Sequence, residues 1–380
     1  MSDPGGMVER LWGGAPIIAP QGEGWESGHT YNAAAVRLPP SDAPLIRGLL
    51  GRDPGADPAR RDGIVAIFYR AQPLVSPGFP APRSSIGLAL FTPELRLLRR
   101  LPEPVMRPSE DLDGFDRNGV EDPRVTRLGD TFYLVYCGFA TRPGASDLVQ
   151  VCLARSDDLL HWEKLGPVPG EVNTAQNKDG VLFPEAMDGR YFLLHRPMVG
   201  PPSQFRIELA VSNSPTGVWR NCGPILAAPA DPICRHAWPG AGSVPIPLGE
   251  RRYLAIHHTG HRLKDGRLWY TAGAALLDFR RFSPDRPAAI VETSVERLLV
   301  PETPFERSRR NGAPVPLDCV FPCGSYEHDS HVHVVYGGRD SYTLAARVDR
   351  EALLARLRDA APRGCDTDAG SSSGCGEQPE

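Results

Sequence analysis

A pair of short apolar strands recurs five times along the chain, and this repeat limits the fold more than any other feature of the sequence. The first strand of each pair ends in an aromatic residue or a histidine, and a turn-rich gap separates it from a second strand of small residues. The first strands are Ile64–Tyr69, Phe132–Tyr136, Tyr191–His195, Tyr253–His257 and Val332–Tyr336. The second strands are Ile86–Ala89, Val151–Ser156, Ile207–Ser212, Ala272–Leu276 and Thr343–Ala346. Repetition at about 50 residues is typical of propellers and solenoids.

The segments between these strands predict short hairpins. Tryptophan-containing turns such as Asp157–Trp162 and Asn213–Trp219 follow two of the small-residue strands, and no long helical period lies between the repeats. Short strands bounded by Gly, Pro, Asp and Asn favour antiparallel sheets arranged radially. A β-sandwich or two β domains would also supply short strands, but neither predicts the same pair five times in order. We therefore predict an all-β, five-bladed β-propeller.

The ends of the chain differ from this repeat. The chain has 380 residues, a length that a single closed all-β domain can reach. We predict an irregular, Gly/Pro-rich N-terminal arm over residues 1–20 and the propeller over residues 21–348. A short helix is predicted over residues 349–360, because its apolar spacing is helical and its charges run from acidic to basic. The Gly/Ser-rich tail over residues 361–380 is predicted to be disordered.

The net charge and the cysteine content indicate which partners the protein can bind and in which cellular compartment it is expected. The formal net charge of −4 gives no basic face for nucleic acid or an anionic membrane. No apolar stretch of about 18 residues and no N-terminal signal pattern occurs, so we expect a cytoplasmic protein. The eight cysteines show no zinc-type spacing, so we expect free thiols and no metal.

The run Glu121-Asp122-Pro123-Arg124 is the best candidate for a catalytic acid. The inner strands of a propeller converge on a central channel, which brings polar residues from distant parts of the sequence together. Pro123 fixes the backbone beside Asp122, and Arg124 is placed to pair with a carboxylate. Taken alone, the same run also fits a strand-entry turn with a surface ion pair.

Two cations of the third repeat form a candidate anion site. Lys178 and Arg196 are placed at the same end of neighbouring strands by a strand-turn-strand hairpin. Arginine binds a phosphate or carboxylate by two hydrogen bonds, and lysine acts as a point charge. The alternative is that these cations only neutralise Asp179 and Glu185.

Further polar and aromatic residues suit a carbohydrate site. Aromatic rings stack on the apolar faces of sugars, and Asp, Asn, Arg and His bind the hydroxyl groups. His257 and His258 point to opposite faces of a strand, so at most one enters the channel. The predicted substrate-binding residues are Asn32, Arg70, Glu121, Arg124, Asp179, Glu185, Trp238, His258 and Asp340.

The motifs together resemble glycoside hydrolase family 130, the mannoside phosphorylases and related β-mannosidases. They occur in order along most of the chain: Asn32-Ala33-Ala34-Ala35, Tyr69-Arg70-Ala71, Glu121-Asp122-Pro123-Arg124, Leu182-Phe183-Pro184-Glu185, His195-Arg196-Pro197, Gly240-Ala241-Gly242 and Tyr336-Gly337-Gly338-Arg339-Asp340. The resemblance implies a five-bladed propeller whose central pocket cleaves a β-mannosidic bond with inversion.

The resemblance also implies a role for each matching residue. Asp122 would be the general acid, acting through a hydroxyl of the bound mannose, while phosphate attacks the anomeric carbon from the opposite face. Lys178 and Arg196 would bind the phosphate, and Asp340 would hold the sugar. Inorganic phosphate would be a co-substrate, and no cofactor is expected. The expected partners are a small carbohydrate and phosphate, without nucleic acid or membrane, and assembly into a homo-oligomer is left open.

One departure from the family pattern leaves the nucleophile open. Phosphorylases of the family usually show a lysine where this chain has Trp238, and we expect His236 or Arg235 to replace that cation. The alternative is an inverting β-mannoside hydrolase, with Glu185 or Glu121 as the base that activates water. A non-catalytic carbohydrate-binding propeller is the third hypothesis.

Overall fold

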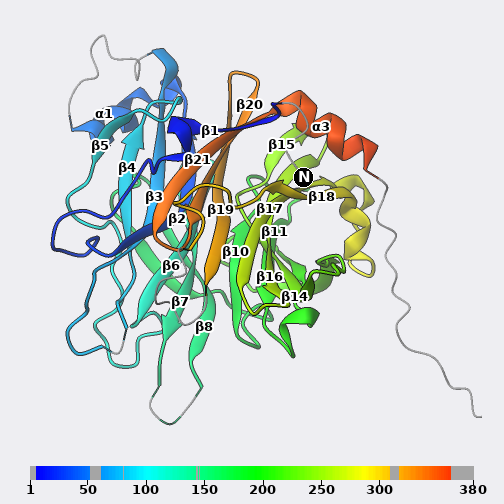
Figure 1. Ribbon diagram of the computed structural model, residues 1–380, viewed down its shortest axis with the longest axis horizontal. Coiled ribbons are helices and arrows are strands. Elements are labelled where there is room, and N and C mark those ends of the chain that lie inside the picture. Colours follow the sequence, from blue (N-terminus) through cyan, green and yellow to red (C-terminus); the bar gives the residue numbers. More distant parts are fainter. Residues whose placement is uncertain are drawn as a thin grey trace, which may run out of the picture.

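The computed structural model describes residues 6–51, 61–79, 81–142, 144, 146–308 and 316–360. Its strands form three separate four-stranded sheets and one nine-stranded sheet, and within each four-stranded sheet consecutive strands pair antiparallel (Figure 1). The nine-stranded sheet contains two blades, which are joined where β17 and β19 run parallel over Leu268–Tyr270 and Leu317–Cys319. Five blades result, as the strand repeat predicts.

Each blade has four main strands in chain order, except the last. Blade I contains β2 (His29–Leu38), β3 (Ile64–Gln72), β4 (Ser85–Phe91) and β5 (Leu97–Arg100). Blade II contains β6 (Gly119–Leu128), β7 (Thr131–Ala140), β8 (Leu148–Ser156) and β9 (Glu163–Pro167). Blade III contains β10 (Asn177–Leu182), β11 (Tyr191–Pro197), β12 (Ile207–Ser212) and β13 (Arg220–Leu226).

Blade IV contains β14 (Cys234–Ala241), β16 (Arg252–Leu263), β17 (Leu268–Asp278) and β18 (Val291–Leu299), with the short β15 (Ile246–Gly249) beside β16. Blade V contains β19 (Leu317–His328), β20 (His331–Gly338), β21 (Tyr342–Asp349) and β1 (Val8–Arg10). The recurrent pairs of the sequence are therefore the second and third strands of every blade. The two tryptophan turns lie between the third and fourth strands of blades II and III.

The N-terminal segment closes the propeller, and this corrects the expectation of an irregular arm. β1 pairs antiparallel with β21 as the fourth strand of blade V, so the first and the last described strands lie side by side in one blade (Figure 1). A 3-10 helix, Leu11–Gly14, follows β1. This pairing was invisible in the sequence because three residues are too few to show a strand pattern.

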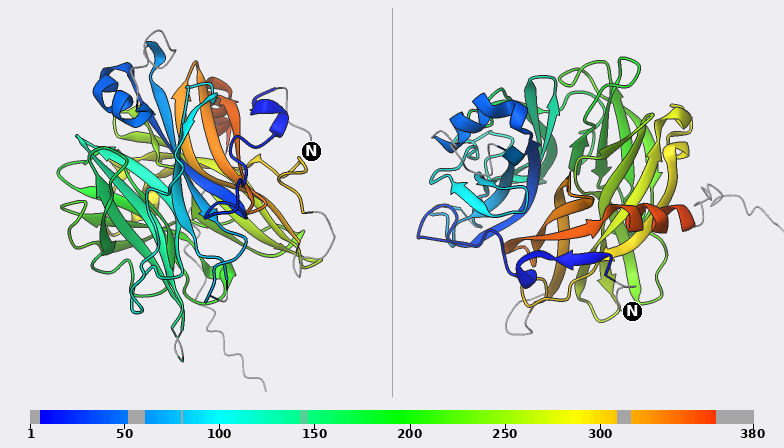
Figure 2. Two further views of the ribbon diagram at one scale, coloured as in Figure 1. Left: turned by 90° about the vertical axis from the view of Figure 1, so that its left-hand side faces the viewer. Right: turned by 90° about the horizontal axis from the view of Figure 1, so that it is seen from above.

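Helices are few and peripheral. α1 (Ala43–Leu50) lies in the connection between β2 and β3, and was not predicted. α3 (Arg350–Asp359) matches the predicted C-terminal helix and lies beside blade V and β18 (Figure 2). Four more 3-10 helices are Pro40–Asp42, Pro202–Gln204, Phe279–Arg281 and Pro287–Ile290. Within the described part of the chain, every helix is too short or too polar to span a lipid bilayer. The predicted tail, 361–380, lies outside the described residues.

The core lies between the blades, with apolar side chains from neighbouring sheets in contact. Phe68 and Leu88 of blade I, for example, share a buried cluster with Leu134 of blade II. Leu353 and Leu357 of α3 are fully buried against blades IV and V. Burial of this apolar surface fixes the blades relative to one another, and therefore fixes the inner strands β2, β6, β10, β14 and β19 around the hub.

Every inner strand carries one extra residue relative to its partner. The register shifts by one residue between Tyr31 and Ala34, between Glu121 and Arg124, and between Lys178 and Val181. Irregularities also interrupt β14 and β19. Such bulges turn side chains away from the regular alternation and are frequent beside active sites.

Arg10 provides a test of closure by β1. Its Nε donates to Glu306 Oε1 over 2.9 Å, and Tyr336 Oη donates to the same carboxylate over 2.7 Å. Because Glu306 is fully buried, Arg10→Ala should lower the free energy of unfolding by about 3–5 kcal/mol, measured by urea denaturation. Arg347→Ala removes only the exposed pair with Glu9 and should cost less than about 1 kcal/mol. Equal effects of the two changes would contradict this account.

Candidate active site

Asp122 lies at the bulge of β6, and groups of blade I hold its carboxyl group. Its side chain is almost fully buried, and its φ of 49° places the backbone in the left-handed region. Asn32 Nδ2 donates to Asp122 Oδ1 over 2.9 Å, and Arg70 Nη1 lies 3.2 Å from the same oxygen. The other terminal nitrogen of Arg70 donates to Glu121 Oε1 over 2.6 Å. Two adjacent carboxylates therefore share one guanidinium group.

The charges around Asp122 decide its protonation. Burial acts to raise the pKa of Asp122, but Arg70, Lys178 and Arg124, with the hydrogen bond from Asn32, outweigh it and hold the pKa at about 2. Burial raises the pKa of the neighbouring Glu121, although Arg70 opposes this shift. Asp122 is therefore ionised at neutral pH in the ligand-free chain.

Arg124 links blades II, III and IV at the centre of the propeller. It is 1% exposed, and its Nη1 donates to the carbonyl oxygen of Asp122 over 2.9 Å. Nε and Nη2 donate to the carbonyl oxygens of Gly242 and Ala241 at the end of β14, over 3.0 and 3.1 Å. Nη2 also lies 3.5 Å from Asp179 Oδ1. The predicted pairing of Arg124 with a carboxylate is present, and its main partners are backbone carbonyls.

Asp179 lies at the bulge of β10 in a cluster of basic groups. Its carboxylate is buried, and lies 3.2 Å from Arg196 Nη2 and 3.5 Å from His258 Nε2. Burial acts against ionisation, but Arg196, His258, Arg124 and Lys178 hold the pKa of Asp179 below its usual value. Burial lowers the pKa of His258 to about 3, although Asp179 opposes the shift, so the ring is neutral. His258 is the one of the two adjacent histidines that faces this cluster.

Lys178 and Arg196 are direct partners across β10 and β11, as the hairpin spacing predicts. Within the described residues, Lys178 has no ion pair within 4.0 Å, although its charge acts on Asp122, Glu121, Asp179 and Asp340. Arg196 Nε is buried without a hydrogen-bond partner among the described groups. Donors of this kind can bind an oxyanion.

Asp340 lies in the turn between β20 and β21. It has a φ of 49° and is exposed as a residue, and its Oδ1 accepts a weak hydrogen bond from the buried Cys319 Sγ over 3.9 Å. Burial and the charges of Asp122 and Glu121 raise its pKa to about 6, against the effects of Arg70 and Lys178. Asp340 is therefore part of the same charged group as Asp122.

Aromatic side chains of blades IV and V lie beside the Asp179 cluster and form the aromatic wall of the site. Trp238 packs edge-on against Tyr270 at 5.9 Å, and His258 lies 4.1 Å from Phe321 between ring centroids. Arg196 Nη1 lies 3.5 Å from the carbonyl oxygen of Pro239, which follows Trp238. His236 contacts the Trp238 ring at 5.7 Å, but among the described residues no hydrogen bond or ion pair joins it to Lys178 or Arg196. The geometry therefore gives His236 no direct part in the cation cluster.

Glu185 does not lie with these residues, contrary to the prediction. It follows the end of β10, six residues beyond Asp179, is exposed, and accepts a hydrogen bond from Tyr253 Oη over 2.7 Å. Tyr253 precedes His258, which faces Asp179, by five residues on the continuous strand β16, and this spacing corresponds to about 17 Å along the strand. Glu185 therefore lies near the other end of the inner strand and cannot be the base of this pocket.

Ser84 belongs to the site but was not among the predicted residues. It is fully buried, receives a hydrogen bond from Arg70 Nε over 2.9 Å and donates to Glu121 Oε1 over 3.3 Å. A serine in a Ser-Ser pair before a strand carries no sequence signal of such a role.

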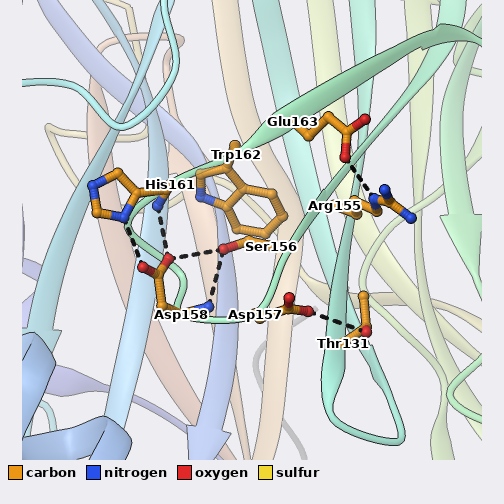
Figure 3. A pocket seen from close by; sticks show the side chains of 8 residues that line it. All are labelled: Thr131, Arg155, Ser156, Asp157, Asp158, His161, Trp162 and Glu163. Atoms are coloured by element: carbon orange, nitrogen blue, oxygen red, sulfur yellow. Dashed lines mark hydrogen bonds and ion pairs between the residues drawn. The ribbon is translucent and has the colours of Figure 1, made fainter.

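A large surface hollow at the outer edge of blade II has a different character (Figure 3). Its volume is about 640 Å³, and its side chains satisfy one another: Arg155 pairs with Glu163, and His161 with Asp158, each over 2.7 Å. Asp158 also accepts backbone hydrogen bonds within its own turn. These contacts explain the hollow as the outer turn of a blade, so the charged hub remains the candidate active site.

Fold and hub together define a propeller whose centre holds paired carboxylates beside basic groups and an aromatic wall, a composition suited to glycosidic bonds. The chain belongs to glycoside hydrolase family 130: the family model, described as β-1,4-mannooligosaccharide phosphorylase, matches residues 83–358. The resemblance inferred from the motifs is thereby confirmed.

Curated relatives and solved structures agree with this assignment. The chain is 28% identical over 329 residues to a 1,2-β-oligomannan phosphorylase of Thermoanaerobacter sp. (strain X514), covering 86% of this chain and 92% of the relative. It is 30% identical to a β-1,2-mannobiose phosphorylase of the same organism, covering 62% and 68%. A β-1,2-mannobiose phosphorylase from Listeria innocua has the same fold, with a TM-score of 0.67, 21% identity, and coverage of 92% and 99%.

Asp340 predicts a pH-dependent change in stability. Its pKa in the folded chain, about 6, lies above the ordinary value of 3.8, so folding strengthens proton binding. The stabilisation that follows is complete below about pH 4 and is lost as pH rises through about 6. The melting temperature of Asp340→Asn, relative to wild type, should therefore increase between pH 4 and pH 7. A difference that stays constant over this range would contradict the shift.

Proposed function

We propose that this protein is an inverting phosphorylase of β-mannosides, which converts a mannooligosaccharide and inorganic phosphate into α-mannose 1-phosphate and a shortened acceptor. The observation that carries the proposal is the pairing of Lys178, whose charge acts on Asp122, with Arg196 across β10 and β11, and no described carboxylate forms an ion pair with this lysine. Family membership and the names of the curated relatives support it. Those names also make a β-1,2-linked mannoside the first substrate to test.

In this proposal Asp122 is the general acid, and Lys178 and Arg196 bind the phosphate. Asp122 gives a proton, through a hydroxyl group of the bound mannose, to the oxygen of the leaving sugar as the glycosidic bond breaks. The anomeric carbon then carries positive charge in an oxocarbenium-like transition state. Phosphate is already an anion, so it needs only orientation by Lys178 and Arg196 and no base. Asn32, Arg70 and Asp340 are proposed to fix the sugar and the acid.

Because Asp122 is ionised in the free chain, it must gain a proton before it can act as the general acid. Arg70, Lys178 and Arg124 keep the carboxyl group deprotonated in the free chain. A phosphate that binds beside Lys178 offsets part of that positive charge and raises the proton affinity of Asp122. We therefore propose that the acid acquires its proton as the substrates bind.

Asp179 gives specific support to a second candidate, hydrolysis. A buried carboxylate next to Arg196 competes with phosphate for that guanidinium and could instead orient a water molecule. Glu121 remains the other carboxylate near Asp122 that could act as a base, whereas Glu185 is too distant. We favour phosphorolysis because Lys178 stays available to an anion.

We also propose that the protein is cytoplasmic, because its described cysteines are free thiols. Cys137, Cys152, Cys222, Cys234, Cys319 and Cys323 are free thiols, the form that a reducing cytoplasm maintains. Cys365 and Cys375 lie outside the described residues.

The products distinguish the hypotheses. Incubation with β-1,2-mannobiose, and in parallel with β-1,4-mannobiose, should release α-mannose 1-phosphate only when phosphate is present, detected by chromatography. Asp122→Asn should lower the rate by about 10²–10⁴-fold, because it removes the acid, while sugar binding by calorimetry persists. Asp188→Asn, at the exposed pair with Arg251, serves as the matched control and should leave the rate unchanged. Free mannose released without phosphate would favour hydrolysis, and no turnover would favour a binding protein.

Asp179 tests the anion site directly. In Asp179→Asn the competing negative charge beside Arg196 is removed, so the KM for phosphate should fall about tenfold, equivalent to about 1.4 kcal/mol, with kcat changed little. Initial rates at varied phosphate and saturating mannoside give both constants. A higher KM for phosphate would instead mean that Asp179 positions Arg196 for its anion.

A further inference from the structure

A turn at the start of blade IV brings a carboxylate and a thiol together, outside the candidate active site. Cys234 N donates to the carbonyl oxygen of Asp231 over 3.1 Å, and Ile233 N donates to Asp231 Oδ1 over 3.0 Å. The register of β14 against β16 shifts directly after Cys234. The turn and the shift place both side chains on the side of β16.

His261 of β16 completes the group. Its Nδ1 lies 3.4 Å from Cys234 Sγ, and its Nε2 lies 3.4 Å from Thr271 Oγ1 on β17. The imidazole is buried and lies 4.9 Å from the Trp269 ring. Burial and the charge of Arg297 lower the pKa of His261 to about 4, so the ring is neutral at pH 7. In the tautomer that carries its proton on Nε2, the neutral ring donates to Thr271 and presents the Nδ1 lone pair toward Cys234.

We propose that Asp231, Cys234 and His261 form a binding site for one Zn²⁺ ion. Their ligand atoms, a carboxylate oxygen, Sγ and a ring nitrogen, all lie within 4.8 Å of one another. Zn²⁺ binds thiolate at about 2.3 Å and imidazole at about 2.0 Å, so tetrahedral geometry requires a separation of about 3.6 Å between sulfur and nitrogen. The observed 3.4 Å fits this requirement without movement of the strands.

The surroundings supply the outer hydrogen bonds that zinc sites use. The Thr271 hydroxyl can accept from His261 Nε2–H when Nδ1 binds the metal, and Arg297 pairs with the other carboxylate oxygen of Asp231, leaving lone pairs on both oxygens. Burial and Asp231 raise the pKa of Cys234, so the thiol is protonated without metal. Binding therefore replaces the S–H proton by the metal and releases that proton to solvent.

Mixed ligands favour zinc over other divalent ions. Mg²⁺ and Ca²⁺ prefer oxygen ligands alone, whereas one thiolate and one imidazole suit Zn²⁺. Cys234 and Asp231 are partly exposed, which gives an ion access from solvent. The sequence showed no zinc pattern because His261 follows Cys234 by 27 positions and comes from a neighbouring strand. The proposal does not depend on the proposed reaction.

The ion would fasten the connection between β13 and β14 to β16. β14 carries Trp238 four residues after Cys234 and pairs along its length with β16. Fixing this end of the hairpin restrains the aromatic wall of the hub. The alternative is that Cys234 and His261 form only a hydrogen bond and Asp231 only an ion pair with Arg297.

Zinc and cobalt titrations of the full chain test the site. The protein, reduced with a phosphine and freed of metal, is titrated with Zn²⁺ against a chromogenic chelator, and with Co²⁺ by absorption spectroscopy. We expect one equivalent of each ion, and a near-ultraviolet thiolate-to-cobalt charge-transfer band. Zn²⁺ should also protect Cys234, identified by peptide mass, from alkylation.

Matched variants keep the test specific. Cys234→Ser should abolish the cobalt band and weaken Zn²⁺ binding by more than about 100-fold, whereas Thr271→Val, which removes an outer hydrogen bond, should weaken it by about 10- to 100-fold. Cys222→Ser, at a partly exposed thiol of blade III, should leave both unchanged. Absence of the cobalt band in the wild type, or zinc binding that survives Cys234→Ser, would overturn the proposal. Because protection from alkylation is measured on the wild type, misfolding of a variant does not obscure the result.

Discussion

The left-handed bulge in three inner strands is the constraint on which the rest of the hub depends. Asn32, Asp122 and Asp179 occupy the same position of the bulge in β2, β6 and β10, with φ between 45° and 57°. Asn and Asp tolerate this conformation better than other residues with a side chain, although it still costs about 1–3 kcal/mol. Apolar packing between the blades supplies the stability that offsets this strain. In each of these three blades the bulge therefore places one polar side chain at the hub, where a regular strand would alternate.

The hub holds so many charges that its members are stable only as a group. Arg70, Arg124, Lys178 and Arg196 face Glu121, Asp122, Asp179 and Asp340, and each isolated charge would be costly to bury. Arg124 also donates to backbone carbonyls of another blade, so it stabilises the ring and the charges together. This coupling explains why the site combines rigid placement with shifted pKa values, as functional sites commonly do.

Sequence reasoning reached the fold through the second and third strands, because these alone are apolar and regular in every blade. The inner strands show no recurrent pattern in the sequence, since polar residues, and Pro123 in β6, interrupt their alternation at the bulges. The hairpin register of Lys178 and Arg196 could be predicted, because it depends on local spacing. The contact of Arg124 with blade IV, the closure by β1 and the distance of Glu185 could not, because they depend on how the ring closes.

The central claim is that an oxyanion binds at the hub between Lys178 and Arg196 while Asp122 faces the sugar. The most direct measurement is a crystal structure of the protein soaked with phosphate and mannose. The account predicts phosphate within hydrogen-bond distance of both cations, on the side of the mannose ring away from the leaving oxygen. Mannose bound beside Asp122 with no phosphate at the two cations, in crystals soaked at saturating phosphate, would contradict it.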